Sequence, residues 1–244
     1  MRNEPVVVAV VFQPKCFRCQ VLLSGDSLAR DFLAHQFCSS CGLVQPLAAE
    51  ENYFSVLGET CRFGLDPEVL EKRFYRASRL FHPDRFSNSD SAAQALSLSR
   101  MSFLNQAYQT LKNPEALREY VFKREGIFQE SLAQKTGQIP IELIEIAEGW
   151  FELQDEILEE ADSLKVQKKL REFLETLQER KARIDEKILS LEKKYDERKY
   201  DEKNDDSKFS LLVLEEMARE VQNKNYLSSI EKNRDRMTQN VTSI

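Results

Sequence analysis

The chain has 244 residues, of which 31% are charged, and its formal net charge is −6. It contains only seven glycines and seven prolines, so the composition favours a helix-rich protein over a β-sandwich or barrel. An acidic average without a dominant basic surface argues against a general nucleic-acid-binding protein. A chain of this length can form one to three small domains with cores of their own.

Targeting signals are weak in this sequence. The apolar run at residues 6–12 is only seven residues long, far short of a bilayer span. Glu4 and Pro5 make residues 1–13 a poor signal peptide, and one Arg beside one acidic residue makes them a poor mitochondrial presequence. We therefore expect no membrane association and a reducing compartment, with the bacterial cytoplasm first and the mitochondrial matrix as the alternative.

Two Cys-x-x-Cys pairs stand near the start of the chain: Cys16, Cys19, Cys38 and Cys41. Each pair can present two thiolates from one tight turn, and two such turns complete a tetrahedral zinc site. Gly42 follows the second pair and suits a turn that needs a positive φ. The sequence therefore predicts a structural zinc-binding module over residues 1–48, with a possible strand at residues 6–12.

Other roles for these cysteines fit the sequence less well. Structural disulfides are disfavoured without an export signal, and a thioredoxin-like centre would need a single pair in a βαβ setting. An iron–sulfur cluster stays open as an alternative, since zinc and iron share cysteine ligands. We interpret His35 as a bystander and Cys61 as a small, partly buried residue. Basic and acidic residues balance across residues 1–50, so no phosphate-binding surface is indicated.

Residues 66–81 have the pattern of a helix that Asp66 can cap. Its apolar residues recur at four- and three-residue steps: Leu70, Phe74, Ala77 and Phe81. Basic residues recur with the same period on the opposite face or to its side: Lys72, Arg73, Arg76 and Arg79. Pro83 forces its predecessor out of helical geometry, so the helix must end at the tripeptide His82-Pro83-Asp84.

A second helix is predicted over residues 90–112, ended by Asn113-Pro114. Its apolar stripe contains the following residues: Leu96, Phe103, Leu104, Ala107 and Leu111. Two antiparallel amphipathic helices of this kind can bury their stripes against each other. Shorter helical segments are expected at residues 52–58 and 115–123.

Residues 50–126 resemble a J-domain. The resemblance is carried by Tyr53-Phe54 and Leu57-Gly58, by the basic helix and its His-Pro-Asp loop, and by the run Asn105-Gln106-Ala107-Tyr108. It implies a co-chaperone that stimulates the ATPase of a DnaK/HscA-type chaperone. By position, the implied chaperone-binding residues are His82, Pro83, Asp84, Lys72, Arg73, Arg76 and Arg79. A cationic helix face would speed the encounter with an acidic partner.

Residues 140–162 contain nine acidic residues and no Lys or Arg. Apolar residues interleave with the acids, and near Trp150 and Phe151 they cover more of the helix than one buried face requires. Either part of this surface faces a partner or all of it is packed in a helical bundle. Two more helices are predicted at residues 165–195 and 209–235, and residues 196–208 are interpreted as a solvated turn or frayed helix end.

A J-domain followed by a linker (residues 127–139) and an acidic three-helix domain (residues 140–244) resembles the HscB family of iron–sulfur cluster co-chaperones. The four-cysteine leader resembles family variants with an N-terminal zinc module. The resemblance implies that the bundle binds an IscU-type scaffold protein and delivers it to the chaperone, promoting cluster biogenesis and protein complex assembly. The family's scaffold-contact pattern falls on these positions: Leu143, Ile144, Ala147, Glu148, Phe151, Asp155 and Tyr226.

The expected fold is mainly α: a zinc-knuckle module, a J-domain helical hairpin and an antiparallel three-helix bundle. We expect no enzymatic activity, because neither a nucleophile–base pair nor a P-loop is present. One alternative is a J-domain adaptor that serves a client unrelated to iron–sulfur assembly. Another is a zinc-ribbon nucleic-acid or redox module with an incidental helical tail.

Overall fold

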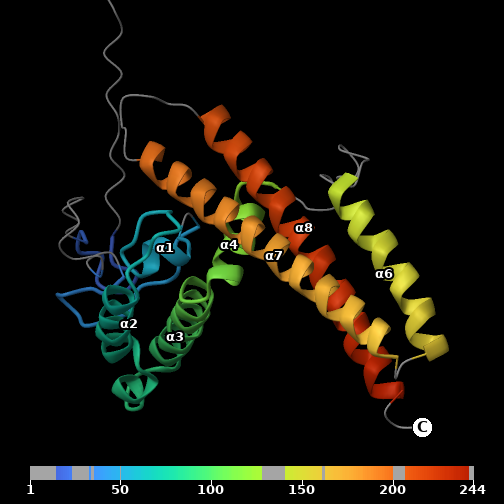
Figure 1. Ribbon diagram of the computed structural model, residues 1–244. Helices are drawn as coiled ribbons and strands as arrows, with labels where there is room; N and C mark the ends of the chain where they lie inside the picture. Colours follow the sequence, from blue (N-terminus) through green and yellow to red (C-terminus); the bar gives the residue numbers. More distant parts are fainter. Residues whose placement is uncertain are drawn as a thin grey trace, which may run out of the picture. The chain divides into compact units, whose positions relative to one another are not determined.

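The computed structural model describes residues 15–23, 33, 36–49, 51–127, 141–160, 163–199 and 207–241 (Figure 1). The predicted fold class is confirmed, because regular structure in these ranges is helical. The helices are α1 (Tyr53–Val56), α2 (Pro67–Phe81), the 3-10 helix η1 (Pro83–Phe86), α3 (Ser91–Leu111), α4 (Pro114–Arg124), α6 (Ile141–Glu160), α7 (Leu164–Lys199) and α8 (Ser207–Val241). The possible strand at residues 6–12 lies outside the described residues, as does His35.

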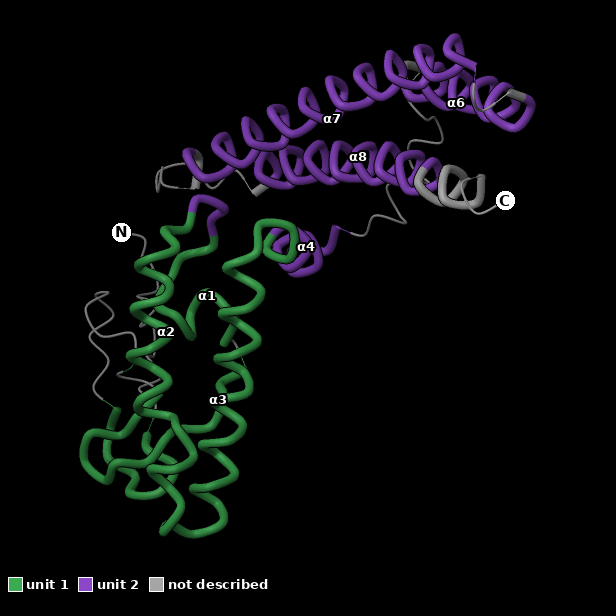
Figure 2. The backbone as a smooth tube through the Cα atoms, turned by 60° about the horizontal axis from the view of Figure 1, so that its bottom comes forward, with its two compact units in different colours: residues 1–61, 65–117 green, residues 62–64, 118–244 purple. Residues whose placement is uncertain are grey.

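The chain forms two compact units, drawn in different colours in Figure 2. The first comprises residues 1–61 and 65–117, and the second comprises residues 62–64 and 118–244. The division falls within α4, and most of the predicted linker lies outside the described residues. The domain boundaries inferred from the sequence stay predictions.

In the first unit, α2 and α3 pack against each other as a hairpin joined through η1. Asp66 caps α2 as expected, accepting hydrogen bonds from the backbone N–H groups of Glu68 (2.9 Å) and Val69 (3.2 Å). Asp90 caps α3 in the same way through the N–H of Ala93 at 2.8 Å. The Asp66 cap fixes where α2 begins, and the Asp90 cap fixes where the loop from α2 ends and α3 begins.

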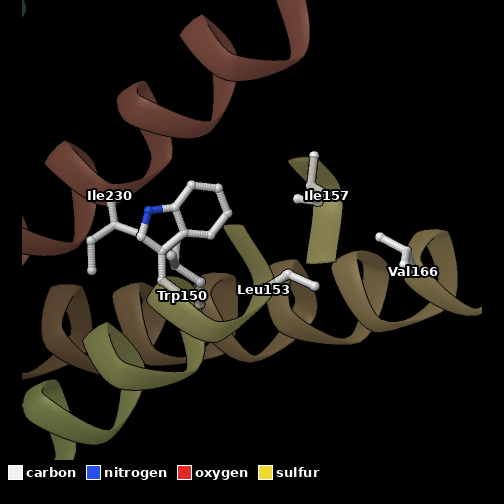
Figure 3. Close-up of a cluster of buried hydrophobic side chains, with 6 residues drawn as sticks. Trp150, Leu153, Ile157, Val166 and Ile230 are labelled. Atoms are coloured by element: carbon white, nitrogen blue, oxygen red, sulfur yellow. The ribbon is translucent and has the colours of Figure 1, made fainter. Parts of the chain in front are cut away.

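The second unit is built around three helices, α6, α7 and α8. Figure 3 shows its apolar cluster, in which Trp150 of α6 lies among side chains of all three helices. The cluster contains these buried residues: Trp150, Leu153, Ile157, Val166, Leu177 and Ile230. Trp150 also stacks on Phe173, with ring centroids 5.6 Å apart. Because residues late in α6 meet residues early in α7 and late in α8, successive helices run antiparallel.

The solvated turn or frayed helix end predicted at residues 196–208 is too long at both ends, and residues 200–206 lie outside the described residues. Helix α7 continues through Lys199, and α8 already begins at Ser207. The carboxylate of Asp196 accepts hydrogen bonds from the backbone N–H groups of Phe63 (2.8 Å) and Gly64 (2.7 Å). Tyr195 is buried with its ring edge-on to that of Phe63. These tertiary contacts extend the helix beyond the point where local composition suggests an end.

None of the helices in the described ranges combines the length and the apolar character needed to cross a membrane.

Candidate metal centre and interaction loop

The two cysteine pairs fold into turns of the same design. Cys16 donates its N–H to the carbonyl of Val21 (2.8 Å), and Cys38 donates to that of Leu43 (2.9 Å). Isolated antiparallel bridges close the turns, Lys15 with Leu22 and Phe37 with Val44. Each bond and bridge of the second turn falls 22 positions after its counterpart in the first. The two turns therefore present their cysteines as a repeated pair of knuckles.

A left-handed residue is needed in each knuckle. Gly42 takes it in the second, with φ 68°, as its sequence position predicts. Gln20 takes the equivalent place in the first knuckle with φ 58°. A non-glycine residue is strained in this region, so the first knuckle carries a local cost that the rest of the module must offset.

The four cysteine sulfurs fit a metal ion. All four lie within 4.8 Å of one another, and the Cys16–Cys41 and Cys19–Cys38 sulfurs are 3.6 and 3.7 Å apart. Zinc–sulfur bonds of about 2.3 Å in a tetrahedron place the sulfurs roughly 3.8 Å apart. All four cysteines are free of disulfides. Residues Cys16, Cys19, Cys38 and Cys41 can therefore hold one tetrahedral metal ion.

The His82-Pro83-Asp84 loop begins where α2 ends. His82 leaves the helix with φ −58° and ψ 129°, and η1 starts at the next residue. The N–H of Asp84 donates to His82 Nδ1 (3.3 Å), whereas both side chains stay exposed. Beneath the loop, Ser97 of α3 donates its hydroxyl to the carbonyl of Phe81 at 2.6 Å. The loop is thus anchored from below and presents its polar groups outward.

The basic residues of α2 divide into two sets. Lys72, Arg76 and Arg79 are exposed on one side of the helix. Arg73 instead contacts the α1 end, where its guanidinium donates to the carbonyls of Leu57 (3.2 Å) and Gly58 and pairs with Glu59 (3.0 Å). The role of Arg73 in chaperone binding stays a prediction, but its guanidinium already forms an ion pair with Glu59 inside the first unit.

The seven predicted scaffold-contact residues also divide. Leu143 is only 2% exposed and Ala147 is buried, while Tyr226 is half-buried and packs on the Trp150 cluster. The exposed members lie on one face of α6, and Leu158, which the sequence does not single out, extends that face. We call this face the α6 stripe: Ile144, Glu148, Phe151, Asp155 and Leu158.

Comparison with known proteins identifies the relatives of this chain. No family model matches it. An iron–sulfur cluster co-chaperone protein HscB from Mus musculus is 30% identical over 166 residues, 67% of this chain and 69% of the mouse protein. The chain belongs to the HscB co-chaperone family.

Two further HscB proteins extend this result. The co-chaperone protein HscB of Proteus mirabilis is 42% identical over 76 residues, but the match spans only 44% of that protein. The crystal structure of human co-chaperone protein HscB superposes with a TM-score of 0.56, covering 90% of this chain and 96% of that one, at 24% identity. The human HscB structure therefore supports the fold.

One group of residues in this HscB-family chain is not apparent from its sequence motifs. Arg100 of α3 is 2% exposed, and it binds Gln36 and Gln45, which flank the second cysteine pair. Its spacing carries a signal, because Arg100 falls on the buried stripe of α3 between Ser97 and Leu104. An arginine at an apolar position of a helix indicates that its guanidinium has hydrogen-bond acceptors inside the protein. The sequence does not show which residues these acceptors are.

The cluster thiols differ in pKa. For Cys16, burial raises the pKa, but hydrogen bonds from the backbone N–H groups of Cys19 and Arg18 outweigh it and lower the pKa to about 6. For Cys41, burial and, to a smaller extent, the neighbouring cysteines together raise the pKa to about 12. Without metal at neutral pH, Cys16 is therefore a thiolate and Cys41 a thiol.

Zinc binding should therefore release protons. Because the thiol of Cys41 must lose its proton to bind metal, we expect the zinc association constant to rise by about tenfold or more per pH unit between about pH 7 and 8. Below the pKa of Cys16 its thiolate is protonated as well, so the zinc affinity falls more steeply there. Competition with a chromophoric chelator measures this slope. Cys61→Ser should leave it unchanged, whereas an affinity independent of pH would contradict the assignment.

Proposed function

We propose that this chain is a J-domain co-chaperone, which stimulates the ATPase of a DnaK/HscA-type chaperone and delivers an IscU-type iron–sulfur scaffold protein to it. The observation that carries the proposal is the exposed His82-Pro83-Asp84 loop at the end of a helix with exposed cations. Membership of the HscB family supports it, since the relatives are named as co-chaperones and the mouse protein as an iron–sulfur cluster co-chaperone.

The chaperone-facing surface consists of the loop and three cations of α2. Lys72, Arg76 and Arg79 project into solvent, where they attract an acidic partner over about a Debye length, roughly 8–10 Å in physiological salt. The loop then supplies specificity, because its polar groups are held by Pro83 and by the hydrogen bond from Ser97 to the helix end. Attraction therefore brings the partners together, and loop geometry decides which partner is accepted.

The scaffold-facing surface in this proposal is the α6 stripe. Ile144, Phe151 and Leu158 recur seven residues apart, with Glu148 and Asp155 between them on the same face. Large exposed apolar side chains are the usual anchors of protein interfaces, and carboxylates beside them favour a partner with basic residues. Leu143 and Ala147, being buried, support the helix from behind.

The metal in this proposal is zinc, and its role is structural. Residues Cys16, Cys19, Cys38 and Cys41 would hold it as thiolates, and the ion would supply the cross-link between the two knuckles. Besides its cysteines, the described part of the leader buries only a handful of apolar side chains: Leu23, Leu33, Leu43 and Val44. A segment of this size depends on a metal for its fold.

The chaperone assignment is tested by His82→Gln. We expect ATPase stimulation of a cognate DnaK-type chaperone to fall about tenfold or more, the equivalent of at least ~1.4 kcal/mol of barrier lowering. Steady-state phosphate release measures the effect, and Lys123→Gln on the exposed face of α4 is the matched control. Full stimulation by the His82 variant would overturn the assignment.

Neighbouring residues on α6 separate stability from scaffold binding. Trp150→Ala should lower the free energy of unfolding by about 3–5 kcal/mol, because it empties the centre of the cluster. Phe151, 64% exposed, should change stability by no more than about 0.5 kcal/mol when replaced by Ala. The same Phe151→Ala exchange should weaken binding of an IscU-type scaffold about tenfold.

Urea unfolding and calorimetric titration give these two quantities. Leu212→Ala, which removes a similarly exposed apolar side chain from α8, should leave scaffold affinity unchanged. Equal losses of affinity for Phe151→Ala and Leu212→Ala would argue for a client that binds elsewhere.

A further inference from the structure

Arg100 of α3 binds the segment at residues 36–51, which contains and follows the second cysteine pair. Its guanidinium donates to the carbonyls of Gln45 and Pro46, each at 2.7 Å, and to the side chains of Gln36 (3.3 Å) and Glu51. All four acceptors come from residues 36–51. A buried cation is tolerated only when its donors are satisfied, so α3 depends on the ordered end of the leader.

Gln45 carries this connection to the metal-binding cysteines. Its side-chain N–H lies 3.5 Å from the sulfur of Cys16, and its side-chain oxygen accepts the N–H of Phe17 at 2.9 Å. Its backbone N–H donates to the carbonyl of Gln36 at 2.9 Å. One residue therefore contacts a metal ligand on one side and the guanidinium of Arg100 on the other.

The same arginine reaches the end of α2. Its guanidinium carbon lies 6.0 Å from the ring centroid of Phe81, which is fully buried and directly precedes His82. One turn earlier on α3, Ser97 binds the carbonyl of Phe81. The position of Phe81, and with it the start of the His-Pro-Asp loop, is thus set by two adjacent turns of α3.

A second connection reaches the other side of the loop. Phe37 precedes the ligand Cys38, and the guanidinium carbon of Arg85 lies 5.9 Å from its ring centroid. Arg85 follows Asp84 directly, and it also donates to the carbonyl of Arg79 at 3.2 Å. The cysteine module therefore contacts the chain directly after Asp84, through Phe37 and Arg85, and reaches the residue before His82 through Arg100 of α3.

We propose that the metal-loaded cysteine module is a brace for the His82-Pro83-Asp84 loop, with Arg100 and Arg85 as positioning residues. Metal binding cross-links the knuckles and so orders Gln36, Phe37 and Gln45, which hold these two arginines. Without metal the knuckles lose their cross-link, the arginines lose fixed partners, and the loop samples other geometries. The consequence for the chaperone rests on the function proposed above, but the brace can be tested without a chaperone.

Amide hydrogen exchange in the full-length protein tests the brace. The N–H groups of Arg85 and Ser89 are bonded within the loop, to His82 (3.0 Å) and Phe86 (2.9 Å), so their exchange reports loop opening. Removing zinc with a chelator under reducing conditions should speed their exchange by about tenfold, and adding Zn²⁺ should restore it. The amide of Leu177, in the second unit, should not respond.

Arg100→Met separates positioning from a merely structural role. Methionine keeps an aliphatic side chain but has no hydrogen-bond donors. The amide exchange rates of Arg85 and Ser89 should therefore be high even with zinc bound, and removing zinc should raise them by no more than about twofold. Zinc affinity should fall as well, because the coupling between the leader and α3 is reciprocal, and Lys123→Met should keep both the parent affinity and the full zinc response. If the Arg100 variant does not fold, Phe37→Leu gives the same comparison at Arg85.

Two results would overturn the brace. One is a loop amide exchange rate that is the same with and without zinc in the parent chain. The other is an effect of zinc removal on this rate that is as large in the Arg100 and Phe37 variants as in the parent chain. These results are independent of chaperone activity. If His82→Gln failed to affect the ATPase while loop exchange followed zinc, the proposed function would be wrong and the brace would stand.

Discussion

The guanidinium of Arg100 is a permanent charge in the interior of the first unit, and its surroundings explain much of that unit. Four acceptors from residues 36–51 satisfy its donors, which ties the cysteine leader to the helical hairpin. An apolar residue at this position of α3 would need no hydrogen-bond acceptors from the leader. The arginine makes the hairpin and the leader mutually dependent. The loop at the end of α2 contacts both, through Phe81, which is bonded to α3, and through Arg85, which lies against Phe37 of the leader.

The two compact units carry different kinds of surface. The first presents a rigid polar loop beside cations, a surface suited to fast, salt-sensitive encounters with an acidic partner. The second presents an apolar stripe with carboxylates on α6, a surface suited to a client with apolar and basic groups. Both surfaces depend on buried neighbours for their geometry, Phe81 behind the loop and Trp150 behind the stripe. This division is consistent with a protein that brings a client to a chaperone.

Sequence periodicity predicts the helices well and predicts side-chain roles less evenly. The bounds of α2 and α3 follow from their caps and apolar spacing, because these signals are local. Arg73 and Arg76 are both basic residues of one helix, yet Arg73 is held by the carbonyls of Leu57 and Gly58 while Arg76 is exposed. Leu143 and Ile144 differ in the same way, one buried and one exposed. Such differences depend on tertiary packing, which local spacing does not encode.

In the proposed brace, the metal site and the His-Pro-Asp loop belong to one cooperative structure. The most direct measurement is a urea titration of the full-length zinc-loaded protein, followed both by zinc release to a chromophoric chelator and by the ring resonance of His82. Both signals should change at one urea concentration, because leader and hairpin unfold together. Zinc release at clearly lower urea, with the native His82 resonance intact, would contradict the brace.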